Sequence, residues 1–173
     1  MLSLSLQKIR TPHERFEREY ASGQLEADED FRVVAPVSLS FDIFKQEQRF
    51  RLAGRVRTTL ELACCRCLEA FTTPVDAPFD LRYQPHTENT GEGELEIEED
   101  DLTTAFYEHN EIDLGQLMRE QFYLSLPMKP LCSEECRGLC PVCGTNLNRG
   151  ACACTTVWED PRLAALRELR DRN

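Results

Sequence analysis

The sequence predicts an α+β protein with an antiparallel β-sheet or partly open barrel, one covering amphipathic helix and a zinc-ribbon-like, cysteine-rich C-terminal segment. Three observations predict this class. Apolar and polar residues alternate over residues 31–83, as in strands with one buried face. Apolar residues then recur at helical spacing within residues 102–130. Six of the nine cysteines follow within residues 131–156. Residues 157–173 complete the chain as a short terminal helix.

The first 83 residues predict the sheet. Residues 1–30 contain one short alternating run, which favours an edge strand followed by a loop or short helix. Within residues 31–83, three strands are expected at 33–43, 50–62 and 71–83, with a turn at 45–48. Gly54 is expected to mark a bulge in the second strand. Proline cannot donate to a ladder, so the strands near three prolines should be edge or interrupted strands: Pro36, Pro74 and Pro78.

Four arginines share the outward parity of the second strand, roughly 7 Å apart with one gap. One interpretation is a surface that binds RNA phosphates or an acidic partner. The other is a solvated strand face with cross-strand ion pairs to Asp42, Asp76 or Asp80. The sequence leaves both open for the row Arg49, Arg51, Arg55 and Arg57.

The second half begins with a linker at residues 84–101, which holds eight acidic residues and no Lys or Arg. Such a run does not order itself by burial, and it could face a basic partner. Asp113 and Gln116 predict a helical capping box. The expected buried stripe is Leu114, Leu117, Met118, Phe122 and Leu124, and the expected helix stops are Pro127 and Pro130.

The cysteines predict structural zinc, because pairs two or three residues apart and closed four-ligand sites are typical of it. Our preferred partition has two ions. The first takes Cys64, Cys67, Cys132 and Cys136, and the second takes Cys140, Cys143, Cys152 and Cys154. Cys65 is expected to be a free, partly buried thiol, and a pairing of Cys65 with Cys67 stays open. Other pairings, or one occupied site with spare buried thiols, stay open on the sequence alone.

Two other chemistries compete for the same cysteines. The spacing of Cys136, Cys140 and Cys143 is that of a radical SAM cluster motif, but only 30 residues follow Cys143, too few for the barrel that such chemistry needs. A simple iron–sulfur cluster stays open. Thiol–disulfide exchange through Cys64 and Cys67 would place the redox pair at a strand end rather than at a helix start.

The formal net charge of −11 argues against a protein that coats nucleic acid. It favours a basic protein partner or a small basic patch, or it serves solubility alone. No apolar run approaches a membrane span, and the first residues lack a signal-peptide pattern, so we expect a cytoplasmic protein. No catalytic constellation, phosphate loop or dinucleotide fingerprint appears, so we do not expect an enzyme.

Residues 62–69, 112–127 and 132–148 together carry a recognisable set of motifs. They include Cys64-Cys65-Arg66-Cys67 and Cys140-Pro141-Val142-Cys143-Gly144. In combination they resemble the YceD-like family, bacterial and chloroplast proteins of the large-subunit ribosomal RNA accumulation group. The resemblance covers roughly residues 30 to 170.

This resemblance implies a non-enzymatic role in making or protecting 23S rRNA during large-subunit assembly. The implied partners are 23S rRNA, a basic large-subunit ribosomal protein, or both, with no membrane and no small-molecule substrate. Some family members lack the cysteine-rich tail, which implies that the second metal site is dispensable to the shared role. The competing hypothesis is a cysteine-based metal- or redox-sensing or iron–sulfur protein.

Overall fold

The computed structural model describes residues 2–25, 28–85 and 104–155, and it divides into two compact units. We call Met1–Ala63 with Ala70–Pro130 the sheet unit, and Cys64–Glu69 with Leu131–Asn173 the cysteine unit. The elements of the sheet unit are β1 (Ser3–Ser5), η1 (Leu6–Lys8), β2 (His13–Tyr20), η2 (Ser22–Gln24), β3 (Arg32–Val33), β4 (Val37–Gln46), β5 (Arg49–Ala63), β6 (Ala70–Pro85), β7 (Thr104–Tyr107), β8 (Glu111–Asp113) and α1 (Leu114–Ser125).

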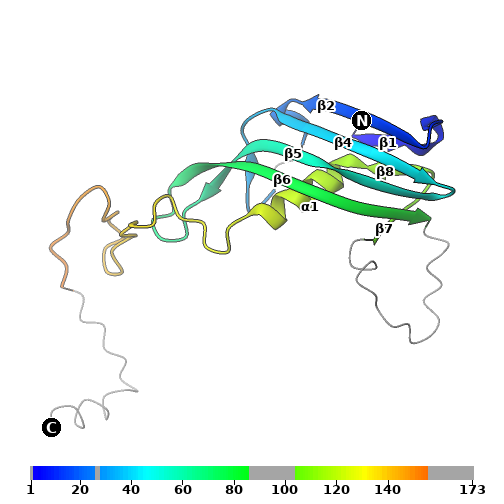
Figure 1. Cartoon of the computed structure of the whole chain (residues 1–173). Helices are drawn as coiled ribbons and strands as arrows, with labels where there is room; N and C mark the ends of the chain where they lie inside the picture. The colour runs from blue at the N-terminus through cyan, green and yellow to red at the C-terminus, as the bar shows by residue number, and fades with distance from the viewer. Residues whose placement is uncertain (1, 26–27, 86–103, 156–173) are drawn as a thin grey trace, which may run out of the picture. The chain divides into compact units, whose positions relative to one another are not determined.

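The main sheet has six strands in the order β2-β4-β5-β6-β7, with β3 also paired to β5 (Figure 1). Its pairings are antiparallel except that of β6 with β7, which is parallel, so the sheet is mixed rather than purely antiparallel. β1 and β8 form a separate antiparallel pair. The eight-residue strand β2 lies at the edge of the sheet, before the range over which alternation predicted strands.

One face of β4, β5 and β6 is buried, as the alternation predicted. The apolar residues of one parity are buried in each strand, whereas their neighbours of the other parity are largely exposed. The buried core therefore includes Val37, Leu39, Phe41, Ile43, Phe50, Leu52, Val56, Leu60, Leu62, Val75, Ala77, Phe79 and Tyr83. Burial of these side chains supplies the main driving force for the sheet.

The predicted bulge at Gly54 is wrong, because the register continues through it without an extra residue. Gly54 pairs with Phe41 on one side and Phe79 on the other. A Cβ atom at this position would lie 2.3 Å from the Ser40 carbonyl oxygen and 2.4 Å from the Phe41 Cβ. The glycine is therefore required by a close approach of β4 to β5 rather than by a bulge.

The prolines lie where a ladder tolerates them. Pro74 and Pro78 are in the part of β6 that pairs only with β5 within the described chain, since β7 pairs with Arg82–Pro85. Pro36 lies in the break between β3 and β4. The expectation of edge or interrupted strands is confirmed at all three prolines.

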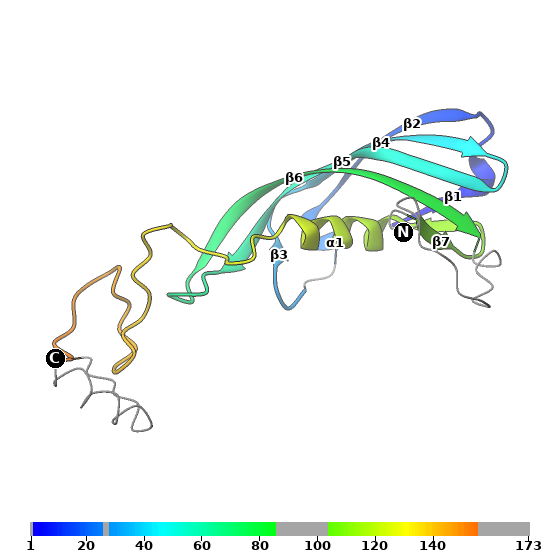
Figure 2. The same ribbon diagram turned by 60° about the horizontal axis from the view of Figure 1, so that its bottom comes forward.

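Helix α1 begins at the predicted cap. The Asp113 carboxylate accepts hydrogen bonds from the backbone N–H groups of Gly115 and Gln116, at 2.8 and 3.0 Å. The Gln116 side chain donates to Glu120. The helix covers the inner face of the sheet and contacts β6 and β1 (Figure 2).

The predicted buried stripe of α1 is correct for four residues and wrong for one. Leu114, Leu117, Met118 and Phe122 are buried, but Leu124 is 79% exposed. The helix ends at Ser125, before the two predicted proline stops. Leu124 lies in this last turn, where it does not reach the sheet core.

Two predicted segments fall outside the described residues: most of the acidic linker, 86–101, and the terminal helix at 157–173. No helix in the described ranges has the length and apolar character needed to span a membrane.

Replacing Gly54 with Ala should destabilise the protein by about 1–3 kcal/mol, because the added methyl group meets backbone atoms of β4 that cannot move aside. Urea unfolding followed by circular dichroism measures the effect. Gly23→Ala is the matched control, since a Cβ there meets nothing within 4 Å. Equal midpoints for the two variants would contradict the close approach at Gly54.

Candidate metal centres

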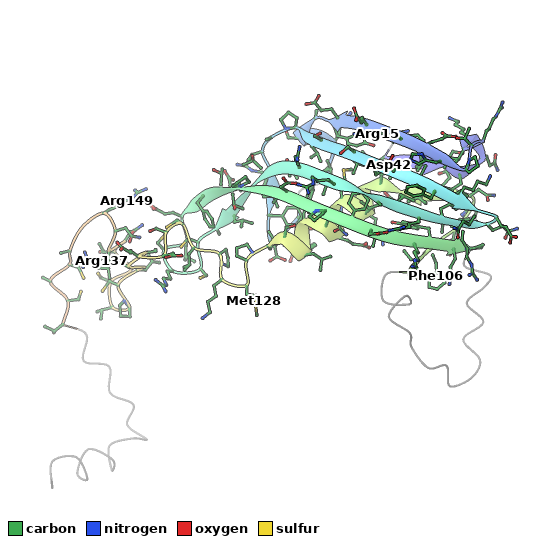
Figure 3. The ribbon with its side chains drawn as sticks, in the orientation of Figure 1. Arg15, Asp42, Phe106, Met128, Arg137 and Arg149 are labelled. Atoms are coloured by element: carbon green, nitrogen blue, oxygen red, sulfur yellow. The ribbon has the colours of Figure 1, made fainter. Side chains whose placement is uncertain are left out.

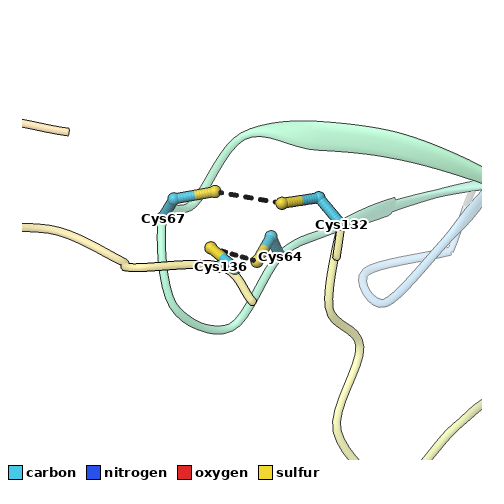
Figure 4. A group of neighbouring side chains, drawn as sticks. All are labelled: Cys64, Cys67, Cys132 and Cys136. Carbon is cyan, nitrogen blue, oxygen red and sulfur yellow. Dashed lines mark hydrogen bonds between the residues drawn. The ribbon is translucent and has the colours of Figure 1, made fainter. Parts of the chain in front are cut away.

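The first candidate metal centre joins two distant parts of the chain within the cysteine unit. Cys64 and Cys67 lie in the turn that connects β5 to β6, and Cys132 and Cys136 follow α1. Figure 4 shows the four side chains pointing toward one another. The Sγ atoms of Cys64 and Cys136 are 3.7 Å apart, as are those of Cys67 and Cys132. Cys64, Cys67 and Cys136 are buried.

The sulfur spacing fits a single tetrahedral ion. Zinc–thiolate bonds of about 2.3 Å place the corners of a tetrahedron roughly 3.8 Å apart. All four sulfurs lie within 4.8 Å of one another, and the two S–S distances of 3.7 Å are far longer than a disulfide bond of about 2.05 Å. A polynuclear iron cluster would separate thiolates bound to different irons more widely. The donor set therefore fits one thiophilic ion.

The second candidate centre brings together Cys140, Cys143, Cys152 and Cys154, whose sulfurs also lie within 4.8 Å of one another. It is more exposed than the first, with only Cys140 buried. An antiparallel bridge between Leu139 and Asn146 closes the loop that contains Cys140 and Cys143. The structure thus groups the eight cysteines into the two sets that the sequence predicted.

The two centres share one local backbone geometry. In the first, the Leu68 N–H donates to the Cys64 carbonyl at 2.8 Å, and in the second the Gly144 N–H donates to the Cys140 carbonyl at 2.9 Å. The residue after the second cysteine has a positive φ in both, +60° at Leu68 and +72° at Gly144. Each turn directs two thiols to one side. The left-handed backbone conformation costs free energy at Leu68 but little at Gly144, because glycine has no Cβ.

Polar contacts around the first centre hold its two chain segments together. The Arg66 guanidinium donates to the carbonyls of Glu134 and Cys136, at 3.2 and 2.9 Å. The Arg66 carbonyl in turn accepts from the Leu139 N–H at 3.1 Å. Arg66 is exposed, yet it connects the turn between β5 and β6 to the segment after α1 through these hydrogen bonds.

Asn148 also contacts the first centre through two hydrogen bonds. Its side-chain N–H donates to the Cys136 Sγ at 3.3 Å, and its Oδ1 accepts from the Arg137 N–H at 2.7 Å. Hydrogen bonds of this kind orient metal ligands and stabilise a thiolate.

Hydrogen bonds lower the pKa of two thiols in each centre: Cys64 and Cys136 in the first, and Cys140 and Cys143 in the second. Backbone hydrogen bonds from Cys132 and Cys67 lower the pKa of Cys64 to about 6. Hydrogen bonds from the Thr145 side chain and backbone lower the pKa of Cys143 to about 6. Because thiolate is the form that binds metal, both centres can begin to coordinate a cation near neutral pH.

Cys65, the cysteine between the first pair, is exposed and belongs to neither group. Cys65 thus lies apart from the two sets of four, as expected, but the expectation that it is partly buried is wrong.

The four arginines of β5 lie on the exposed face of the sheet, largely in the cross-strand pairs that formed the alternative interpretation. Arg51 binds Asp80 through two hydrogen bonds. Arg55 and Arg57 share Asp76, at 3.0 and 3.2 Å. An anion that binds this row competes with carboxylates already in place.

The sheet unit also has a groove of about 1100 Å³ beside α1, lined by apolar side chains such as Phe31 and Phe122 and by the carboxylates of Glu111 and Glu120. The Tyr20 hydroxyl is buried in its lining without a hydrogen-bond partner in the described chain. Neither histidine nor cysteine is among the described residues that line it.

Comparison with known proteins gives a consistent match. A family model described as "Large ribosomal RNA subunit accumulation protein YceD" matches residues 52–170. Two relatives carry the name "Large ribosomal RNA subunit accumulation protein YCED homolog 1, chloroplastic". The Zea mays protein is 30% identical over 142 residues, which cover 69% of this chain and 48% of the relative. The Arabidopsis thaliana protein is 28% identical over 164 residues, which cover 83% and 51%.

An uncharacterised protein from Mycobacterium leprae is 28% identical over 113 residues, covering 65% of this chain and 50% of that protein. The chain thus spans about half the length of the curated relatives it matches. No solved structure matches it.

Replacing Leu68 with Gly should stabilise the cysteine unit by about 1 kcal/mol, because glycine removes the cost of the left-handed backbone conformation. The matched control is Gly144→Leu, which introduces that cost at the equivalent position and should destabilise. Thermal unfolding of both variants at equal metal content measures the two shifts. Shifts of the same sign would contradict the equivalence of the two turns.

Proposed function

The chain belongs to the large ribosomal RNA subunit accumulation protein YceD family, and on that premise we propose that it is a non-enzymatic ribosome-biogenesis factor. It supports the accumulation of 23S rRNA and the assembly of the large subunit. Two closed sets of four sulfurs carry the non-enzymatic part of this proposal. Four protein ligands leave an ion no open position for a substrate, so the metal stabilises rather than reacts.

We propose that each set of cysteines binds one zinc ion. The donor set supports zinc, because four thiolates select a soft or borderline cation over Mg²⁺ or Ca²⁺. The first ion would join segments 65 and 72 residues apart in the chain, and the second would close a compact, zinc-ribbon-like loop. Metal binding then contributes folding free energy to a unit with few buried apolar residues.

The proposed ligand is 23S rRNA, a basic large-subunit ribosomal protein, or both. The net charge of −11 supports a basic protein, and the arginine row supports a local contact with phosphate. Arg49, Arg51, Arg55 and Arg57 stay our candidates for that contact, although three of them already pair with carboxylates. The cytoplasmic location also stays a prediction, since two relatives are named as chloroplastic.

The second candidate function is an iron–sulfur or redox-sensing protein. The number of cysteines and the exposed Cys65 beside the first centre favour it. The single-ion sulfur spacing favours zinc instead. A visible absorption band from the purified protein would support the second candidate, whereas a colourless protein with bound zinc supports the first.

The purified protein should contain about two zinc ions per chain, one for each set of four thiolates. Cys67→Ala and Cys143→Ala should each lower the content to about one, because each removes a ligand from a different centre. Cys65→Ala is the control and should keep both ions. Elemental analysis measures the zinc content per chain. Loss of a zinc ion in Cys65→Ala would overturn the assignment of the eight cysteines to two centres.

A strain that lacks the gene should accumulate less 23S rRNA relative to 16S rRNA, and the wild-type protein should restore the ratio. Cys67→Ala should fail to restore it if the first zinc centre is needed for the fold, whereas Cys65→Ala should succeed. Quantitative analysis of total RNA and of ribosomal subunits measures the outcome. An unchanged rRNA ratio in the deletion strain would reject the proposed function.

A further inference from the structure

We propose that one end of the exposed sheet face binds single-stranded RNA, through a row of side chains that crosses four strands. The register aligns His13 with Phe44, Phe44 with Arg51, and Arg51 with Arg82. We call these four residues the cross-strand row. The inference rests on the proposed function and identifies the part of the molecule that would contact RNA.

The cross-strand row contains a stack of planar groups open to solvent. The His13 ring stacks on the Phe44 ring with centroids 4.7 Å apart and an interplanar angle of 8°. The guanidinium carbon of Arg51 lies 6.0 Å from the centroid of the Phe44 ring. Phe44 is 37% exposed, and the side chains of His13 and Arg51 are each more than half exposed.

A solvent-exposed phenylalanine between an imidazole ring and a guanidinium group is poorly explained as core packing. Phe44 has the outward parity of β4, opposite to Phe41 and Ile43 in the core. Nucleobases stack on aromatic rings and on guanidinium planes, and a single strand leaves its bases free to do so. The cross-strand row therefore offers planar side chains on which a base could stack, and these side chains are not part of the buried core.

The rows on either side of the cross-strand row add positive charge and a second aromatic ring. On one side, just beyond the last β5–β6 register pair of Phe50 with Tyr83, Arg49 pairs with Gln46, and Gln84 pairs with Phe106, which is 40% exposed. The row on the other side contains Arg15, Asp42 and Asp80 (Figure 3 labels Arg15, Asp42 and Phe106). Across the three rows, the described chain places four arginines against two aspartates: Arg15, Arg49, Arg51 and Arg82 against Asp42 and Asp80.

The other end of the same face has the opposite balance. Glu17, Glu19 and Asp76 lie there beside Arg55 and Arg57. Charge is therefore separated along the face, and the aromatic stack coincides with the positive end. A polyanion with exposed bases is the ligand that complements both properties. Duplex RNA satisfies only the charge, because its bases are paired and stacked on one another.

The test uses the zinc-loaded full chain and fluorescein-labelled single-stranded RNA. The RNA is about ten nucleotides long, which lies within the site size of known domains that bind single-stranded nucleic acid. An RNA duplex of the same length is the comparison ligand. Fluorescence anisotropy at two salt concentrations gives affinity and salt dependence. Phe44→Leu removes the ring but keeps an apolar side chain, Phe44→Trp keeps stacking, and Arg51→Ala with Arg82→Ala removes charge.

Phe44→Leu should weaken binding of the single strand by about 5- to 100-fold with an unchanged salt dependence, because it removes stacking only. Phe44→Trp should bind as tightly as the wild type. The double arginine variant should lose affinity and lower the salt slope by about 1–2. Controls are Arg32→Ala, another exposed strand arginine paired with a carboxylate, and Leu124→Ala, another exposed apolar residue. Both should bind normally.

The proposal is overturned if Phe44→Leu binds as tightly as the wild type with an unchanged thermal midpoint and zinc content. Equal affinity for the duplex, or an equal loss in Arg32→Ala, would also overturn it. The rRNA assay separates this result from the proposed function. A wild-type protein that binds no RNA but restores the 23S rRNA ratio rejects the RNA surface alone, whereas failure to restore the ratio rejects the function itself.

Discussion

The contact on which the cysteine unit depends is the convergence of Cys64 and Cys67 with Cys132 and Cys136. The paired sulfurs are separated by 72 and 65 residues in the chain and by 3.7 Å in space. Closing so long a loop costs conformational entropy, and few buried apolar side chains in this unit repay that cost. A shared ion, as proposed above, would supply stabilising free energy, and the hydrogen bonds of Arg66 and Asn148 hold the segments that carry the four thiols.

The two centres are variations on one turn with different surroundings. In both, a cysteine carbonyl accepts from the N–H four residues later and the residue after the second cysteine has a positive φ. The first centre is largely buried and braced by side chains, whereas the second is more exposed and uses Thr145 and its own backbone. The two turns differ most at Leu68, where the second turn has glycine. Leu68 has a strained positive φ and is 67% exposed.

Strand parity divides the sheet unit into a buried face and an exposed face. One parity of β4, β5 and β6 forms the core under α1, and the other forms an exposed face on which charge and aromatic rings are unevenly distributed. A chain with a net charge of −11 can therefore carry a local positive surface without losing its acidic character elsewhere. On that face Arg51 pairs with Asp80, and Arg55 and Arg57 both pair with Asp76.

Local rules determined much of this protein. Alternation gave the three long strands and their buried residues, Asp113 marked the helix start, and cysteine spacing gave the correct grouping of eight thiols. Pairing across the chain decided the rest. The alternation of β2 is weak, because inward positions such as Glu14 and Arg18 are polar, so its place at the sheet edge follows only from pairing with β4. The parallel addition of β7, the need for glycine opposite Phe41, and the alignment of His13, Phe44 and Arg51 depend likewise on neighbours distant in sequence, which no local periodicity encodes.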